Sequence, residues 1–158
     1  CGAQAPAALC DACAADLPRL SGPLCPICAT PLVLQVLACA VGLKAPPAFD
    51  ATLAPLYYRF PVDRLVQNLK YARRLASAEF FARALLAGKH PAGTLIVPVP
   101  LSRLRLRERG FNQALEIARP LARALALPLD TPSLARPRET PPQSRLPWRA
   151  PPLRCARP

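Results

Sequence analysis

Six of the seven cysteines in this chain of 158 residues lie within its first 39 positions. Four of them form two Cys-x2-Cys pairs, Cys10 with Cys13 and Cys25 with Cys28, and eleven residues separate the pairs. Such a pair makes a tight turn that holds two thiolates on one face of a tetrahedral metal ion. Because so short a segment cannot build an apolar core, a bound zinc ion would replace that core. The spacing therefore predicts a zinc-binding region.

Disulfides and a redox-active pair are the alternative interpretations of these cysteines. Disulfides need an oxidising compartment, and no secretory signal is visible at the start of the sequence. A redox pair of the thioredoxin type lies in a βαβ unit, and no such pattern surrounds either pair. Zinc is therefore favoured over both alternatives.

The number of zinc ions is left open by the spacing. The cysteines divide into two groups of three: Cys1, Cys10 and Cys13, then Cys25, Cys28 and Cys39. The first group lacks a cysteine that would lie upstream of residue 1, and the second has Gly42 where its fourth ligand should fall. We expect one or two zinc ions. A single four-thiolate site made by the two Cys-x2-Cys pairs remains an alternative.

Basic residues dominate the chain after the cysteine-rich region. The net charge is +12, and arginine outnumbers lysine eighteen to three. Residues 1–55 carry a net charge of −1, whereas residues 56–129 carry +9 and residues 130–158 carry +4. A guanidinium group can bind two phosphate oxygens at once, so this excess favours phosphate-bearing partners. An arginine-rich composition that reflects GC-rich coding explains part of the bias.

The segments between the cysteines and the tail predict alternating strands and helices. Apolar runs at 52–60 and 94–100 predict strands, the second of them a buried parallel strand. Helical spacing of apolar residues predicts helices at 62–72, 76–87 and 112–125, with Pro120 kinking or dividing the last. Arginines at every second position from Arg103 to Arg109 predict a loop between the second strand and the last helix. Such loops bind anions, although a solvated amphipathic turn is the alternative.

These features together resemble the ComF family, in which a double zinc ribbon precedes a type I phosphoribosyltransferase-like domain. Besides the cysteine pairs, the matching segments lie at 46–50, 58–63, 69–71, 97–100, 107–113 and 136–143. The most specific are Arg-x-Arg-Gly-Phe-Asn-Gln from Arg107 and Arg-x-Arg-x-Thr-x-x-Gln from Arg136. The resemblance covers residues 1 to about 148, in order and with the spacing of the family.

The resemblance implies an α/β fold in two parts. Residues 1–45 would form the zinc ribbons, and residues 46–148 an incomplete phosphoribosyltransferase-like domain with a parallel sheet. It also implies a cytoplasmic protein of DNA uptake in natural transformation, with single-stranded DNA and the uptake motor as partners. The phosphate-binding role carries over to these residues: Arg103, Arg107, Arg109, Gly110, Asn112 and Gln113. Asn112 and Gln113 would cap the next helix or touch the ligand.

The chain departs from the family in its acidic residues. Phosphoribosyltransferases carry an Asp-Asp pair and a Thr-Thr-Gly loop, which engage the ribose or metal and cradle the phosphate. This sequence has nine acidic residues, no two adjacent, and no Thr-Thr-Gly. Phosphoribosyl pyrophosphate (PRPP) or another phosphoribosyl ligand, with Mg, is therefore expected only in a full-length form. We expect no catalytic activity of this chain.

The tail at 149–158 is rich in proline and arginine and shows neither helical nor strand periodicity. It predicts a frameshift or truncation near Trp148, and a genuine basic tail that binds nucleic acid is the alternative. The longest apolar run, residues 32–43, is shorter than the roughly 20 residues of a membrane span. The leading hypothesis is a ComF-like protein. The alternatives are a zinc-dependent module that binds nucleic acid or the uptake motor without enzymatic activity, and a non-functional truncated product.

Overall fold

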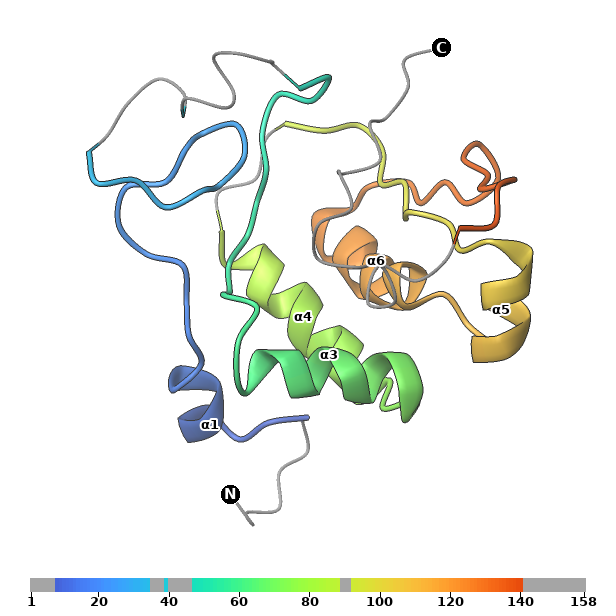
Figure 1. Cartoon of the computed structure of the whole chain (residues 1–158), viewed down its shortest axis with the longest axis horizontal. Coiled ribbons are helices and arrows are strands. Elements are labelled where there is room, and N and C mark those ends of the chain that lie inside the picture. Colours follow the sequence, from blue (N-terminus) through green and yellow to red (C-terminus); the bar gives the residue numbers. More distant parts are fainter. Residues whose placement is uncertain (1–7, 35–38, 40–46, 89–91, 141–158) are drawn as a thin grey trace.

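The computed structural model describes residues 8–34, 39, 47–88 and 92–140. Within these ranges the regular elements are helices (Figure 1). They are α1 (Asp11–Ala15), α3 (Val62–Tyr71), α4 (Ala76–Leu86), α5 (Arg103–Arg109) and α6 (Gln113–Leu125). Helix α4 packs against both α6 and α3. Figure 1 shows these three helices in the middle of the molecule, with α1 on one side and α5 on the other.

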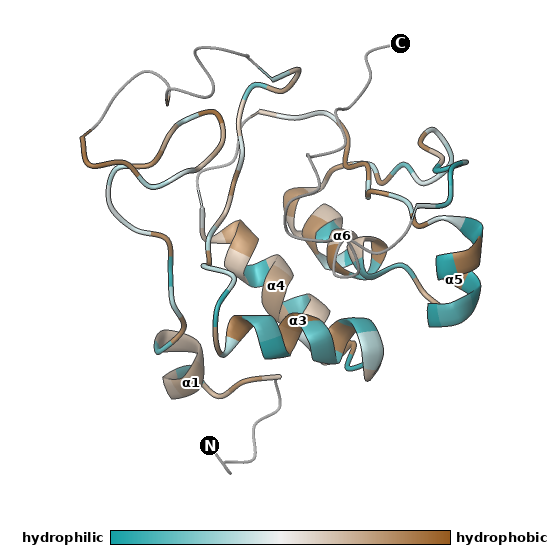
Figure 2. Cartoon of the chain, in the orientation of Figure 1, coloured by the Kyte–Doolittle hydropathy of each residue, from teal (hydrophilic) through white to brown (hydrophobic). Residues whose placement is uncertain are grey.

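The buried side chains of the two central helices are small. The buried apolar residues are all alanines: Ala78, Ala82 and Ala84 of α4, and Ala118 and Ala122 of α6. Alanine lets two helix backbones approach more closely than larger side chains do. Leu69 of α3 is only 1% exposed and extends this core. In Figure 2, α4 is mainly apolar whereas α5 is mainly hydrophilic, as expected for a central and a peripheral helix.

The three predicted helices are present as α3, α4 and α6, with ends within one residue of those expected from apolar spacing. Pro120 does not divide α6, which continues from Gln113 to Leu125. Proline in a helix interior removes one backbone donor, here the partner of the Glu116 carbonyl group. The packing of α6 on α4 outweighs that loss.

The predicted parallel sheet is wrong, because no strand forms among the residues that the structure describes. Ile96 makes a single parallel bridge with Leu129: its N–H donates to the Pro128 carbonyl and its carbonyl accepts from the Asp130 N–H, both at 2.9 Å. The next bonds of a parallel ladder would need donors at Pro98 on one side and Pro128 on the other. Neither nitrogen carries a hydrogen, so the pairing ends after one bridge. The predicted α/β class, with the parallel sheet of a phosphoribosyltransferase-like domain, is therefore not seen in the part of the chain that the structure describes.

Among the described residues, the predicted strand at 52–60 likewise forms a single bridge and no ladder. Leu56 pairs antiparallel with Arg19, through Leu20 N–H to the Pro55 carbonyl at 3.1 Å and Tyr57 N–H to the Pro18 carbonyl at 2.8 Å. This pairing joins the cysteine-rich region to the chain that enters α3. The boundary at residue 45 stays a prediction, and the tail at 149–158 lies outside the described residues. None of the described helices is long and apolar enough to cross a bilayer.

We expect the α4–α6 contact to be intolerant of larger side chains. Ala118→Leu should lower the free energy of unfolding by about 1–3 kcal/mol, because the added atoms force the two helices apart. Ala124→Leu, at an exposed position of the same helix, should change it by less than about 0.5 kcal/mol. Urea denaturation followed by circular dichroism measures both. Equal stability of the two variants would contradict the described packing.

Candidate functional site

Three of the six predicted metal ligands lie together in the structure. The Sγ atoms of Cys25, Cys28 and Cys39 are all within 4.8 Å of one another, and those of Cys28 and Cys39 are 3.5 Å apart. Four thiolates around one zinc ion at about 2.3 Å place their sulfur atoms about 3.8 Å apart. Cys25 is buried and the other two are half-buried. The sulfur spacing and the thiolate chemistry therefore fit a zinc ion.

A tight turn presents the Cys25 and Cys28 side chains, as their spacing predicts. An antiparallel bridge between Leu24 and Pro31 closes the turn, and the Cys25 N–H donates to the Thr30 carbonyl at 2.9 Å. The Sγ of Cys28 lies 3.0 Å from the Thr30 hydroxyl oxygen. The segment thus folds back on itself and holds both thiols on one side.

Backbone amides favour the thiolate form of Cys25. Its pKa is lowered to about 6, chiefly by the N–H of Cys28, with further help from the N–H groups of Cys39 and Ile27. The Cys39 nitrogen lies 3.4 Å from the Cys25 sulfur. Hydrogen bonds to the charged form outweigh the opposing effect of burial. A metal ion binds the thiolate, so this centre has a ligand that is already deprotonated near neutral pH.

The other cysteine pair is separate from this cluster. Cys13 lies in α1 and Cys10 is its N-cap residue, and neither belongs to the three-sulfur cluster. Figure 1 shows α1 well apart from the loop at 20–34. The pKa of Cys10 is lowered, first by the backbone N–H of Cys13 and then by its thiol. Cys1 and Gly42 lie outside the described residues, so a first metal group of Cys1, Cys10 and Cys13 stays a prediction.

The arginine segment predicted as a loop contains a helix, α5. Ser102 is its N-cap residue and accepts from the Arg105 N–H at 3.5 Å. Gly110 ends the helix with φ +79, in the left-handed region that glycine adopts most readily. A serine before the segment and a glycine after it were the signals of a helix. The alternation of arginine and leucine concealed them.

The residues predicted to bind phosphate lie along α5 and at the start of α6. Arg103 and Arg107 are exposed. Arg109 lies over the ring of Tyr71, 5.5 Å from its centroid, and donates to the Gln113 side chain at 2.5 Å. These contacts join α5 to α3 and α6 and fix the direction of the Arg109 side chain. The phosphate-binding role of these residues stays a prediction.

Asn112 and Gly110 have structural roles in the connection from α5 to α6. Asn112 caps α6 by accepting from the Ala114 N–H, and its side-chain amide donates to the Val99 carbonyl, each at 3.0 Å. At Gly110 a Cβ would come within 2.7 Å of the Arg73 guanidinium, so that side chain packs against the glycine. Arg73 and Tyr71 therefore belong to this surface. Tyr71 lies in the family-matching segment at 69–71, but no sequence motif indicated that either residue contacts α5 or its end.

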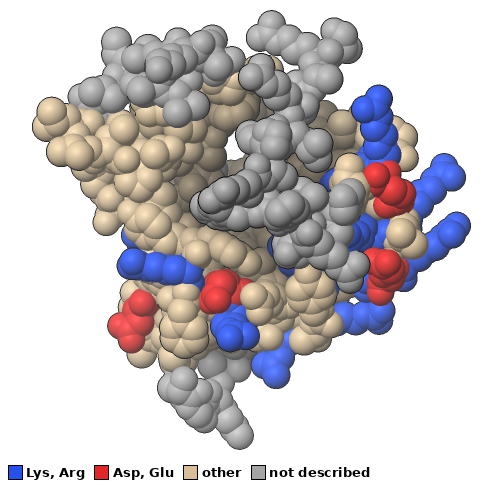
Figure 3. All heavy atoms as spheres, in the orientation of Figure 1, with Lys and Arg blue, Asp and Glu red and all other residues tan. Residues whose placement is uncertain are grey.

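Arginine side chains gather on one side of the molecule. Figure 3 shows lysine and arginine concentrated around α5 and the segment at 131–140, on the right in this view. Helix α5 alone carries four arginines and one glutamate. Such a surface attracts phosphate groups and repels basic partners.

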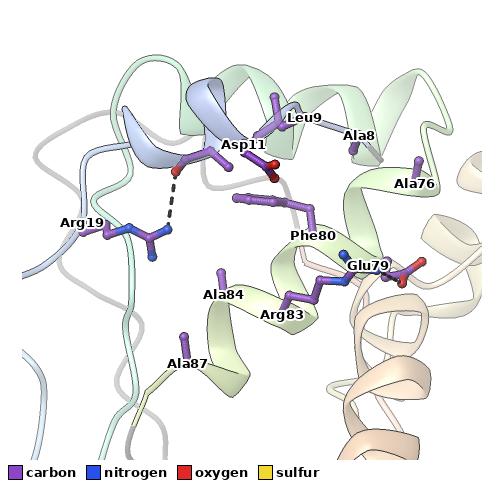
Figure 4. Close-up of a pocket in the computed structure, with 11 residues that line it drawn as sticks. Ala8, Leu9, Asp11, Arg19, Ala76, Glu79, Phe80, Arg83, Ala84 and Ala87 are labelled. Atoms are coloured by element: carbon purple, nitrogen blue, oxygen red, sulfur yellow. Dashed lines mark hydrogen bonds and ion pairs between the residues drawn. The ribbon is translucent and has the colours of Figure 1, made fainter. Parts of the chain in front are cut away.

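A pocket of about 290 Å³ lies between α1 and α4 (Figure 4). Phe80 points into it, and charged residues of both signs surround its mouth. Arg83 pairs with Glu79 at 2.6 Å, and Arg19 donates to the Ala14 carbonyl at 3.4 Å. Because both of these arginines already have partners within the chain, we assign no ligand to the pocket.

The cysteine cluster and the basic surface define this chain as a basic protein with a candidate thiolate metal centre. It is 34% identical over 146 residues to the DNA utilization protein YhgH of Salmonella typhi, which covers 87% of this chain and 64% of that protein. It is 32% identical over 130 residues to the protein of the same name from Escherichia coli (strain K12), covering 77% and 57%. Competence protein F of Haemophilus influenzae is 29% identical over 128 residues, covering 76% and 55%.

These similarities confirm the family that the motifs indicated, and the chain belongs to the ComF family. It spans between 55% and 64% of the length of these relatives. No family model matches the chain, and no solved structure matches it.

Removal of one ligand should empty the metal centre. We expect Cys25→Ser to lower the zinc content of the purified protein by about one ion per chain, because the hydroxyl group is a poor zinc ligand. Zinc content is measured by mass spectrometry of the metal after dialysis. Cys155→Ser is the matched control and should leave the content unchanged. An unchanged content in the Cys25 variant would show that the metal is not held at this cluster.

Proposed function

We propose that this chain handles DNA during its uptake or use by the cell, and that it binds the phosphate backbone of single-stranded DNA through α5. The observation that carries the proposal is the concentration of arginine on that helix, where four arginines and one glutamate occupy seven residues. The names of the relatives, DNA utilization protein and Competence protein F, support a role of this kind.

The exposed arginines of α5 suit a repeating row of phosphates. A helix of seven residues is about 10 Å long, so a strand that follows it can place more than one phosphate within reach of its arginines. Arg103 and Arg107 lie four positions apart and so project from one face of the helix. Both are exposed. Their guanidinium groups can therefore bind successive phosphates without rearrangement of the helix.

An exposed aromatic ring favours a single strand over a duplex as the ligand. Tyr71 is 73% exposed and lies beside Arg109. Bases of a single strand are free to stack on aromatic side chains, whereas bases inside a duplex are not. The combination of Arg107, Arg109 and Tyr71 thus offers both a phosphate contact and a stacking surface.

Zinc has a structural part in this proposal. Cys25, Cys28 and Cys39 would hold the ion, which would supply the stability that the cysteine-rich region cannot obtain from an apolar core. We propose no phosphoribosyl transfer by this chain, because its sequence contains no adjacent acidic residues and no Thr-Thr-Gly. The phosphoribosyl ligand with Mg that the family resemblance implies would bind only to longer members of the family.

Loss of two α5 arginines should weaken binding and reduce its dependence on salt. We expect the double variant Arg103→Ala, Arg107→Ala to lower the slope of log affinity against log salt by about 1.4, from about 0.7 for each phosphate contact with a single strand. Fluorescence anisotropy with a labelled single-stranded oligonucleotide measures the slope. Arg83→Ala is the control, because Arg83 is exposed but paired with Glu79 on α4. The proposal fails if the double variant and the control bind alike, or if wild-type binding is insensitive to salt.

A further inference from the structure

One carboxylate fastens the segment at 131–140 to the start of α5. The Ser102 hydroxyl donates to Glu139 Oε2 at 2.5 Å, and the Leu104 N–H donates to Glu139 Oε1 at 3.0 Å. The glutamate lies 37 residues from Ser102 and 35 residues from Leu104 in the chain. Both carboxylate oxygens are thus used, and both bind the same turn of helix.

The two groups that donate to Glu139 belong to the N-cap and the first turn of α5. Ser102 is 2% exposed and also accepts from the Arg105 N–H as the N-cap of α5. The Leu104 N–H belongs to the first turn, where backbone donors have no partner within the helix. A negative charge at this end of a helix is favourable. Consistently, the pKa of Glu139 is lowered by Ser102 first, then by Leu104 and by the nearby positive charges of Arg105 and Arg136.

The contact brings two more arginines to the basic surface. Arg136 and Arg138 are exposed and lie just before Glu139, and Arg136 donates to the Thr140 hydroxyl at 2.6 Å. Helix α5 and the segment at 131–140 together carry six arginines and two glutamates, a net charge of +4. In Figure 3 these segments lie on the side of the molecule where the basic side chains gather.

We propose that Glu139 is a positioning residue for DNA binding. Its two hydrogen bonds, which we call the latch, hold the segment at 131–140 against the start of α5. Arg136 and Arg138 can then bind the phosphate backbone of a single strand together with the arginines of that helix. The inference rests on the proposed function and adds to it a second binding segment and the residue that holds it in place. The Arg-x-Arg-x-Thr motif, which α5 alone leaves without a role, is the segment that the latch positions.

The negative charge of Glu139 and its proposed positioning role predict opposite effects on DNA affinity when the residue is removed. Glu139 is a negative charge beside a basic surface, so by charge alone its removal should strengthen DNA binding. If it positions two arginines, its removal should weaken binding. Glu139→Gln keeps a carbonyl oxygen that can accept from Ser102 or Leu104, whereas Glu139→Ala keeps none. Because both variants are neutral at this position, a difference between them reports the latch and not the charge.

The test compares these two variants in the same anisotropy experiment. We expect Glu139→Ala to bind the labelled single strand more weakly than wild type and to lower the salt slope by up to about 1.4, the share of two phosphate contacts. Glu139→Gln should bind as tightly as wild type or more tightly. Glu108→Ala, which removes an exposed acid from α5, should only strengthen binding. Equal affinities of the two Glu139 variants would show that Glu139 does not position the arginines. Tighter binding of a duplex than of a single strand would show that the partner of this surface is duplex DNA.

A second measurement separates the latch from the proposed function. Hydrogen exchange at the Leu104 amide, followed by nuclear magnetic resonance, should be faster in Glu139→Ala than in wild type or Glu139→Gln, because that N–H loses its acceptor. The Ala118 amide in α6 reports whether the variants remain folded. If exchange differs as expected but no protein binds DNA, the latch stands and the DNA proposal fails. If Leu104 exchange is the same in all three proteins, the latch is wrong whatever they bind.

Discussion

The close contact between α4 and α6 is the interaction on which the rest of the described structure depends. The buried residues of these two helices are alanines and Ser77, and each contributes little apolar area. Stability therefore comes from the close approach of two helices and not from large side chains. Helix α3 adds Leu69 to the same core, and Asn112 at the start of α6 holds the segment that contains Val99. The arginine-rich surface is attached to this core at the turn from α5 to α6.

Outside that core, the described contacts are mainly polar contacts and a cluster of three cysteines. In the cysteine-rich region, three sulfur atoms lie within metal-binding distance, and a single antiparallel bridge ties the region to the chain before α3. At the opposite side, one carboxylate closes the first turn of α5. Large apolar side chains such as Phe60 and Tyr71 are 75% and 73% exposed. A metal ion bound by the three cysteines would add stability where apolar burial is small, and the long-range cap of α5 adds it at the other side.

The sequence predicted what depends on short-range spacing. The helices at 62–72, 76–87 and 112–125 followed from apolar periodicity, and the knuckle of Cys25 and Cys28 followed from its own two-residue gap. The absence of a sheet among the described residues did not follow from apolar composition, because two prolines end the ladder beside Ile96 after one bridge. The bond between Ser102 and Glu139 joins residues 37 positions apart, so no local pattern could reveal it. Tyr71 and Arg73 were missed for the same reason, since they meet α5 only in the folded chain.

The central claim is that single-stranded DNA lies on the surface formed by α5 and the segment at 131–140. The most direct test is photocrosslinking of the full chain to a single strand that carries photoreactive pyrimidines, with the modified residues located by mass spectrometry. The account predicts adducts at Tyr71, within residues 101–113 and within residues 131–140. Adducts confined to α1 and α4, or none above those on an acidic control protein, would contradict it.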